Sequence, residues 1–399
     1  MNTVFPVVQF ESSESHSGCH QSSERKTLPV NSNGSPSEPM SSFLETATDD
    51  ELQDYLLQGV SRTFALTIPQ LPAALACPVA NAYLLCRIVD TIEDEVSLDA
   101  AQKREFCQRF ADVVAGTAEA QDLANDLAPL LSDQTIPAEH ELIRVIPRVI
   151  AITHGFDAEQ RDALHTCVAT MGKGMADFQG QQLKNGLATM KEMDDYCYYV
   201  AGVVGEMLTR LFCCYSTEIA ARKSELMSLA VSFGQGLQMT NILKDLWDDQ
   251  ARDVCWLPRE KFEPYGFDLA SLAPNHDNAG FRAGFSELVA IAHGHLKNAL
   301  DYTLLIPSHE TGIREFCLWA LGMAVLTLRK INKNLDFSAS NQVKITRNSV
   351  KATILVSRIA RRSDWMLKAA FNLAGSGVPM RDPATARTEF KTNHWNGGT

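Results

Sequence analysis

The segment AYLLCRIVDTIEDE carries polar residues at a spacing that could bind metal ions. Tyr83, Arg87, Asp90 and Asp94 are separated by four, three and four residues, with Glu93 beside them. In a helix this spacing places them along one face. The rest of the helix circumference is apolar, which favours a buried helix. The alternative is a charged face exposed to solvent, which is where most charge clusters lie.

A second segment, FGQGLQMTNILKDLWDDQ, repeats this arrangement. Gln238, Asn241, Asp245 and Asp249 follow one another at spacings of three, four and four within an otherwise apolar helix. Carboxylates on two buried helices would incur a large desolvation penalty unless they bound cations. The two segments therefore predict facing walls of one cavity, bridged by metal.

The ligand types indicate which metal this would be. Carboxylate oxygens without histidine or cysteine suit Mg²⁺, which keeps several waters and accepts substrate phosphates as further ligands. A di-iron bundle would show Glu-x-x-His on two helices, and none of the ten histidines has a glutamate three residues before it. The sequence thus favours magnesium and diphosphate chemistry inside a helical bundle.

The elements that position these stripes are helices. Between about residues 47 and 375, apolar residues recur at three- and four-residue spacing, and loops are marked by Pro, Gly and Asx clusters. We predict an all-α, single-domain bundle around a central cavity over residues 46–375. Residues 1–45, rich in Ser, Asn, Pro and Gly, are expected to be a disordered tail, and residues 376–399 an irregular C-terminal tail.

Composition limits the partners and the location. A formal net charge of -12 over 399 residues argues against nucleic-acid binding, which depends on Lys and Arg. Ten scattered cysteines without a CxxC pair indicate reduced thiols in the cytoplasm. The longest nearly apolar run, residues 316–328, is too short to span a bilayer. We expect no transmembrane segment, with peripheral membrane contact as an open alternative, and nothing indicates an oligomeric state.

At the two acidic segments the chain resembles the squalene and phytoene synthase family. The resemblance covers about residues 55–370. It rests on SRTF (61–64), DTIED (90–94), MGKGMADF (171–178), YCYYVAGVVGEMLTRLF (196–212) and QMTNILKD (238–245). It implies the isoprenoid-synthase bundle and the head-to-head condensation of two farnesyl diphosphates to presqualene diphosphate.

The resemblance also implies residue roles. The metal ligands would be Asp90, Glu93, Asp94, Asp245 and Asp249, with Tyr196 and Phe316 as further catalytic residues. The substrate-binding residues would be Ser61, Arg62, Phe64, Tyr83, Arg87, Gln238 and Asn241. The nicotinamide cofactor would contact Arg62, Arg87, Lys344 and Arg347.

The prediction of the final product rests on residues 314–348. This stretch resembles the region that family members use for a second, NADPH-dependent reduction to squalene, with Phe316 and Cys317 at its Phe-Cys pair. The alternatives are a dehydrosqualene or phytoene synthase without the reductive step, or an enzyme that stops at presqualene diphosphate. A non-catalytic isoprenoid-binding protein is a rival of another class, but all five metal carboxylates are present.

Some positions depart from the family pattern. Lys244 stands where the family usually has Arg, Val254 stands at another usual Arg position with Arg252 displaced from it, and Thr346 replaces a basic residue. Gly202 and Gly205 lie inside a predicted helix, where each costs about 1 kcal/mol relative to Ala. We expect them to allow close approach of a farnesyl chain, with tight helix packing as the alternative.

Overall fold

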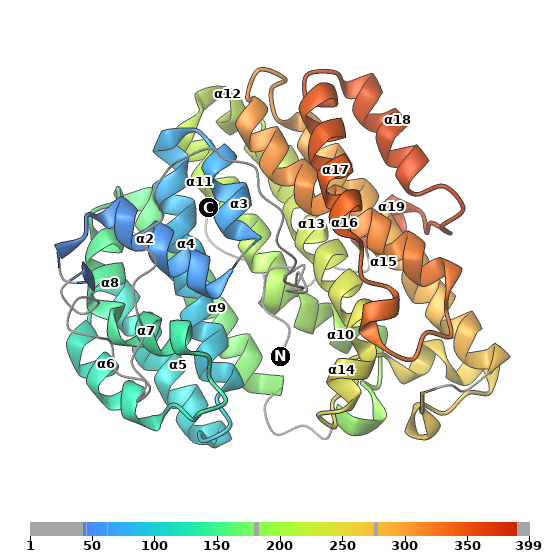
Figure 1. Cartoon of the computed structure of the whole chain (residues 1–399), viewed down its shortest axis with the longest axis horizontal. Coiled ribbons are helices and arrows are strands. Elements are labelled where there is room, and N and C mark those ends of the chain that lie inside the picture. The colour runs from blue at the N-terminus through green and yellow to red at the C-terminus, as the bar shows by residue number, and fades with distance from the viewer. Residues whose placement is uncertain (1–42, 45, 62, 179–182, 275–277, 389–399) are drawn as a thin grey trace, which may run out of the picture.

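A computed structural model describes residues 43–44, 46–61, 63–178, 183–274 and 278–388 (Figure 1). Arg62 and almost all of the predicted N-terminal tail lie outside the described residues, as do residues 389–399. The described residues are helical apart from loops, and their one pairing of extended backbone is an isolated bridge between Leu187 and Pro258. The all-α prediction is confirmed.

The first half of the chain forms a set of mostly short helices around two long ones. The α-helices of this half are α2 (Asp49–Val60), α3 (Phe64–Thr67), α4 (Ala73–Asp94), α5 (Ala100–Ala115), α6 (Ala120–Leu127), α7 (Pro137–Arg144), α8 (Ile146–His154) and α9 (Ala158–Phe178). Three-residue 3₁₀ turns accompany them at η1 (Ile68–Gln70), η2 (Ala128–Leu130) and η3 (Leu183–Asn185).

The second half contributes the longest helices. Its α-helices are α10 (Met190–Cys197), α11 (Val203–Tyr215), α12 (Thr217–Ala220), α13 (Lys223–Lys244), α14 (Leu246–Gln250), α15 (Ala279–Leu305), α16 (Thr311–Lys333), α17 (Arg347–Ala360), α18 (Asp364–Ala374) and α19 (Pro383–Thr388). The 3₁₀ turns are η5 (Arg259–Lys261), η6 (Glu263–Tyr265), η7 (Leu269–Ser271) and η8 (Ser340–Gln342).

Local sequence signals set the ends of these helices. For α5, the Asp99 side chain accepts hydrogen bonds from the backbone of the first turn, and Gln102 bonds back to Asp99. This is a capping box, which satisfies amides that lack a partner within the helix. The helix ends at Gly116, whose φ of 79° favours glycine.

The long helices pack on one another in a chain of contacts. α4 packs on α9, α9 on α11, α11 on α13, and α13 on both α15 and α16. In Figure 1 the helices α2 to α9 lie on the left and α13 to α19 on the right, so the halves of the chain face each other. The two predicted acidic stripes are carried by α4 on one side and by α13 and α14 on the other.

One turn of π-helix, η4 (Tyr198–Gly202), joins α10 to α11. Single π-helical turns inserted in α-helices occur often at functional sites. This turn lies between Tyr196 and the residues of α11 that reach the centre of the molecule.

The interior glycines Gly202 and Gly205 lie where two helical segments approach each other closely. A Cβ atom at Gly205 would lie 2.2 Å from the backbone oxygen of Ala230 on α13, and one at Gly202 would lie 3.1 Å from the side chain of Val231. On α13, Gly234 has the same relation to Ala201, at 2.1 Å. These glycines let α13 approach η4 and α11 closely, which is the alternative of tight helix packing. Gly205 and Gly234 also line an apolar pocket, and contact with a farnesyl chain there stays a prediction.

Three helical segments have the length and mean hydropathy of a membrane span. They are Ala73–Asp94, Met190–Tyr215 and Thr311–Lys333, and 83%, 61% and 72% of the respective apolar windows are buried inside the fold. The sequence argument considered only uninterrupted apolar runs and therefore missed them. In this fold all three supply the core, and the absence of a transmembrane segment stays a prediction.

The predicted domain limits need two adjustments. Phe43 packs edge-on against Tyr55 with ring centroids 5.4 Å apart, and Arg148 donates to the Leu44 carbonyl at 2.9 Å, so these two residues belong to the folded body. Within the segment predicted to be irregular, Pro383–Thr388 forms α19. The Asn298 side chain on α15 donates to the Pro383 carbonyl at 3.0 Å.

Candidate active site

The first acidic stripe lies on a buried face of α4. Asp90 and Glu93 are only 5% and 6% exposed, which excludes the alternative of a solvated face. Arg87 lies 3.8 Å from Asp90 and also forms a close ion pair with Glu139 of α7. Sequence reasoning missed Glu139, because the sequence of α7 carries no signal that would place this helix beside α4.

Tyr83 continues this stripe towards α2 and α3. Its hydroxyl donates to the Val60 carbonyl at 3.4 Å. Burial raises the pKa of Tyr83 to about 12, although the positive charge of Arg87 and a hydrogen bond with Ser61 oppose this. The Phe64 ring stacks on Tyr83 with centroids 4.9 Å apart. The structure therefore brings together all the described residues of SRTF and the α4 stripe that were predicted to bind substrate.

The second stripe is divided between two helices, whereas the sequence predicted one. α13 ends at Lys244, Asp245 takes a non-helical conformation, and α14 begins at the next residue. The backbone amide of Asp245 still bonds to the Asn241 carbonyl at 2.8 Å, and the Asp249 amide bonds to the Asp245 carbonyl at 2.9 Å. Because these four-residue bonds continue through the break, the polar residues keep a common face.

Two buried polar atoms of this stripe lack a hydrogen-bond partner within the described fold. Gln238 Oε1 and Asn241 Nδ2 have no hydrogen-bond partner among the described residues, although both side chains are nearly inaccessible. Unsatisfied polar groups of this kind are costly in a folded protein. Lys244 donates to Asn241 Oδ1 at 3.2 Å and lies 3.0 Å from Asp245, so the lysine that replaces the usual Arg is directed at the stripe.

Three carboxyl groups of the two stripes, those of Glu93, Asp245 and Asp249, are destabilised in their charged form. Burial raises the pKa of Glu93 well above its usual value, and it raises the pKa of Asp249 to about 6. Burial also raises the pKa of Asp245, while the positive charges of Lys244 and Lys344 oppose this. Buried carboxylates with raised pKa values are stabilised by cations, and they mark functional sites more often than structural ones.

Arg252 also faces the second stripe. Its guanidinium lies 2.6 Å from Asp249 Oδ1. The sequence indicated that this arginine is displaced from the family's usual Arg position, where Val254 stands. From its shifted place in the chain the residue still reaches the acidic stripe.

Tyr196 connects the two stripes. Burial raises its pKa well above the usual value, and the negative charges of Glu93, Asp249 and Asp94 add to the effect. These three carboxylates come from α4 and α14, so the Tyr196 hydroxyl lies within electrostatic reach of both walls. At neutral pH the hydroxyl keeps its proton and can donate a hydrogen bond.

An aromatic cluster surrounds Tyr196. The Trp256 ring stacks on it with centroids 3.7 Å apart and planes 10° apart, and Phe178 meets both rings edge-on. Neither Trp256 nor Phe178 was predicted as a site residue. Trp256 follows the second acidic stripe by a few residues, and this closeness was the one sequence signal that could have identified it.

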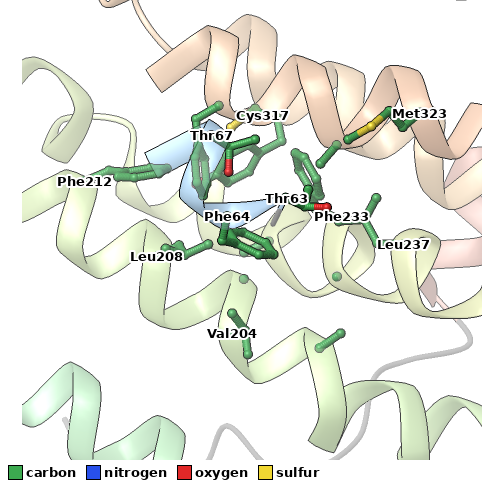
Figure 2. Close-up of a pocket in the computed structure, with 17 residues that line it drawn as sticks. Thr63, Phe64, Thr67, Val204, Leu208, Phe212, Phe233, Leu237, Cys317 and Met323 are labelled. Carbon is green, nitrogen blue, oxygen red and sulfur yellow. The ribbon is translucent and has the colours of Figure 1, made fainter. Parts of the chain in front are cut away.

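An apolar pocket adjoins the stripes between α3, α11, α13, α15 and α16 (Figure 2). The polar side chains in its lining are the hydroxyls of Thr63, Thr67 and Tyr302 and the thiol of Cys317; the other lining residues are Phe64, Ala201, Val204, Gly205, Leu208, Phe212, Ala230, Phe233, Gly234, Leu237, Phe316, Ala320 and Met323. In Figure 2 the α3 segment, with Phe64, lies between α16 and α11. A pocket with this lining suits a long hydrocarbon chain.

Phe316 belongs to this pocket and not to the acidic stripes. Its ring centroid is 6.3 Å from that of Phe64 and 6.4 Å from that of Phe212. Cys317 beside it is buried, and burial raises the pKa of its thiol to about 12, so the thiol stays protonated. The Phe-Cys pair thus contributes packing surface to the apolar end of the site.

The predicted cofactor residues are only partly brought together. Lys344 lies close enough to Asp245 to influence its pKa, whereas Arg347 is exposed at the first turn of α17. Thr346, which departs from the family pattern, caps this helix by accepting a hydrogen bond from the Ser349 amide at 3.2 Å. A basic side chain cannot accept this bond, which gives the departure a structural role.

The stripes fit metal ions only with help from a substrate. Among the described residues, no three His, Cys, Asp or Glu side chains lie close enough to hold an ion by themselves. Mg²⁺ commonly binds through one or two carboxylates, with water and substrate phosphates completing the shell. The oxygen ligands, the raised carboxylate pKa values and the unsatisfied atoms of Gln238 and Asn241 fit this mode. The five-carboxylate metal site remains a prediction.

Comparisons with known proteins agree with this geometry. The squalene/phytoene synthase family model matches residues 57–349. The squalene synthase of Candida albicans is 30% identical over 333 residues, which are 82% of this chain and 72% of that protein. The squalene synthase of Saccharomyces cerevisiae is 31% identical over 312 residues, covering 77% and 66% of the two chains.

A solved structure supports the same assignment. The complex of TcSQS with the ligand BPH1237 superposes with a TM-score of 0.67 at 25% sequence identity, covering 86% of this chain and 95% of that one. The predicted fold and the predicted class of prenyl-transferring enzyme are confirmed by these relations. With its acidic stripes on opposed helices beside an apolar pocket, the chain belongs to the squalene/phytoene synthase family.

Proposed function

We propose that this enzyme joins two farnesyl diphosphates head to head to form presqualene diphosphate, and that it then reduces this intermediate to squalene with NADPH. The observation that carries the proposal is the position of Tyr196. It lies within electrostatic reach of carboxylates from both α4 and α14, and the same helical segment continues through η4 into α11, which lines the apolar pocket.

The carboxylates would hold the metal ions. Asp90, Glu93 and Asp94 would contribute from α4, and Asp245 and Asp249 from the opposite wall. When bound, magnesium would act as a Lewis acid that neutralises the leaving diphosphate. The side chains of Arg87 and Lys244 would bind the remaining diphosphate charge, and Asn241 would add its unsatisfied amide donor. In support, both cations lie beside stripe carboxylates, at 3.8 Å from Asp90 and 3.0 Å from Asp245.

The aromatic and apolar residues would handle the reacting hydrocarbon. The faces of Tyr196 and Trp256 can stabilise positive charge that develops on an allylic carbon. Because the raised pKa keeps Tyr196 protonated, it serves better as a hydrogen-bond donor than as a base. The apolar pocket beside Phe64 and Phe316 would exclude water from the reactive carbons.

The proposed NADPH-dependent reduction is supported by fewer residues. Lys344 lies near the second stripe and could bind a cofactor phosphate there. Arg347 at the start of α17 is the second candidate, and Arg62 and Arg87 are the others. NADPH would supply the hydride, and these side chains would orient the cofactor.

A product assay tests the proposal. The purified enzyme is incubated with farnesyl diphosphate and Mg²⁺, with and without NADPH, and the organic extract is analysed by mass spectrometry. We expect squalene only when NADPH is present. A hydrocarbon that does not change with NADPH would indicate a dehydrosqualene or phytoene synthase. Presqualene diphosphate under both conditions would remove the reductive step from the proposal.

Substitution of the metal carboxylates tests the condensation step separately. Asp90→Ala and Asp245→Ala should each lower turnover by at least about 100-fold, because they remove ligands that act on the leaving group. Asp248→Ala is the matched control, since this neighbouring aspartate is exposed. Full turnover in either of the first two variants would overturn the metal assignment.

A further inference from the structure

Large apolar side chains are exposed on the outer surface of α17 and α18. Leu355 is 60% exposed, Ile359 62%, Trp365 76% and Leu373 74%. Six of the twelve large apolar residues that are exposed in the described part of the chain fall within residues 355–380, and the other six are scattered from residue 66 to residue 265. A concentration of this kind usually marks an interaction surface.

The same two helices are strongly basic. Residues 347–368 contain six Lys and Arg residues and one acidic residue, in a chain whose net charge is -12. Lys351, Arg362 and Lys368 are exposed. The side chains of these three residues form no ion pair or hydrogen bond with another described residue.

The basic and apolar side chains share one side of α17. Lys351, Leu355 and Ile359 follow one another at four-residue spacing, which places them in a row along the helix. All three are exposed. A helix with basic residues beside an exposed apolar face has the pattern of one that lies in a membrane interface.

Ion pairs hold these helices in place. Arg314, buried in α16, lies 2.8 Å from Asp364 at the start of α18. Glu315 of α16 forms a close ion pair with Arg361 in the connection between α17 and α18. The apolar side chains are therefore presented by anchored helices at the edge of the molecule (Figure 1).

An apolar groove runs beneath this surface. It lies between α16, α17 and α18, with Leu321, Val325, Val356, Leu367 and Phe371 among its lining residues. Helix α16 separates it from the active-site pocket, since Ala320 and Met323 of the same helix line that pocket.

We propose that the surface formed by α17 and α18, with Leu355, Ile359, Trp365 and Leu373 at its centre, docks onto a lipid bilayer that carries anionic headgroups. The apolar side chains would enter the headgroup region, where tryptophan is favoured. The three basic side chains would contact lipid phosphates, which attract Lys and Arg near an anionic surface. This assignment does not depend on which hydrocarbon the enzyme makes.

Vesicle flotation with the full-length protein tests this surface. Vesicles of phosphatidylcholine alone are compared with vesicles that also contain phosphatidylglycerol. We expect binding to the anionic vesicles that weakens as salt is added. The triple variant Lys351→Glu/Arg362→Glu/Lys368→Glu and the triple variant Leu355→Ser/Ile359→Ser/Trp365→Ser should each bind at least roughly tenfold more weakly.

Matched control variants distinguish the effect of this surface on vesicle binding from a general effect of net charge or of exposed apolar residues. Arg104→Glu/Arg144→Glu/Arg161→Glu makes the same change in net charge at exposed sites elsewhere and should bind like the unaltered protein. Leu130→Ser controls for loss of an exposed apolar residue. Thermal unfolding by circular dichroism checks that every variant is folded.

Three outcomes would overturn the proposal. The first is that the unaltered protein does not float with anionic vesicles, and the second is that control and surface variants lose binding equally. The third is another occupant of the surface. A second copy would appear as a dimer that the apolar variant dissociates in sedimentation velocity. If the protein bound vesicles only after residues 389–399 were deleted, those residues would be the occupant of the surface.

Discussion

Replacing Asp249 by Asn should stabilise the fold while abolishing activity. Burial raises the pKa of this carboxyl from an unperturbed value of 3.8 to about 6, and the side chain is only 5% exposed. Each pH unit corresponds to about 1.4 kcal/mol, so holding the ionised form in the fold costs about 3 kcal/mol at neutral pH. Because this pKa already reflects the pairing with Arg252, we expect Asp249→Asn to gain about 2 to 3 kcal/mol.

The pH dependence gives the prediction a sign that can be checked. The pKa of Asp249 is higher in the folded protein than in the unfolded chain. The free-energy cost of burying the charged carboxylate is therefore absent below about pH 4, grows between about pH 4 and 6, and is complete above that range. The advantage of Asp249→Asn should therefore be largest at pH 7.5 and about half as large at pH 5. Urea unfolding followed by circular dichroism at both pH values, with a chelator present, measures it.

Asp248→Asn provides the control for this experiment. Asp248 is the exposed neighbour of Asp249, and its substitution should leave the free energy of unfolding unchanged at both pH values. Equal or lower stability of Asp249→Asn at pH 7.5 would refute the claim that burial dominates the electrostatics of this stripe. A gain of the same size in Asp248→Asn would attribute the effect to net charge instead.

Three further substitutions test the packing and the charges of the site. Gly205→Ala should lower the free energy of unfolding by about 1 to 3 kcal/mol, because its Cβ would meet the backbone of α13 at 2.2 Å; an unchanged melting temperature would contradict the close helix contact. Trp256→Leu should reduce turnover more than Tyr196→Phe, since the Phe variant keeps the stacked ring and loses only a hydroxyl; the reverse order in a product assay would point to the hydroxyl. Glu139→Gln should cost roughly 3 kcal/mol in urea unfolding, because Arg87 loses a buried charge partner; a cost near zero would mean that Asp90 alone satisfies the guanidinium.

Much of the site could be predicted because it follows helical spacing. The residues of the α4 stripe stay together because a continuous helix fixes their relation, and helical periodicity is a local property of sequence. The grouping of Ser61, Phe64 and Tyr83 was available only through the family resemblance. Contacts between distant segments depend on tertiary packing, which one sequence does not reveal.

The parts that could not be predicted depend on such distant contacts. Glu139 reaches Arg87 from a different helix, and Trp256 reaches Tyr196 from the loop after α14. The break at Asp245 is also hidden, because the residues around it have good helical spacing. The contact between Gly205 and the backbone of α13 was hidden as well, because a sequence shows that room is needed but not what occupies it.

The π-helical turn η4 has a consequence for how this site can change in evolution. A π turn places one more residue between hydrogen-bonded groups than an α turn does, so it offsets the angular phase of the helix on its two sides. Tyr196 precedes the turn, and Val204 and Leu208 in the wall of the hydrocarbon pocket follow it. Deleting one residue from Tyr198–Gly202 would reset this phase and turn the two groups by about 100° relative to each other. The relative orientation of Tyr196 and the pocket residues therefore depends on the number of residues in this one turn. Substitutions within the turn are far easier to tolerate than an insertion or a deletion.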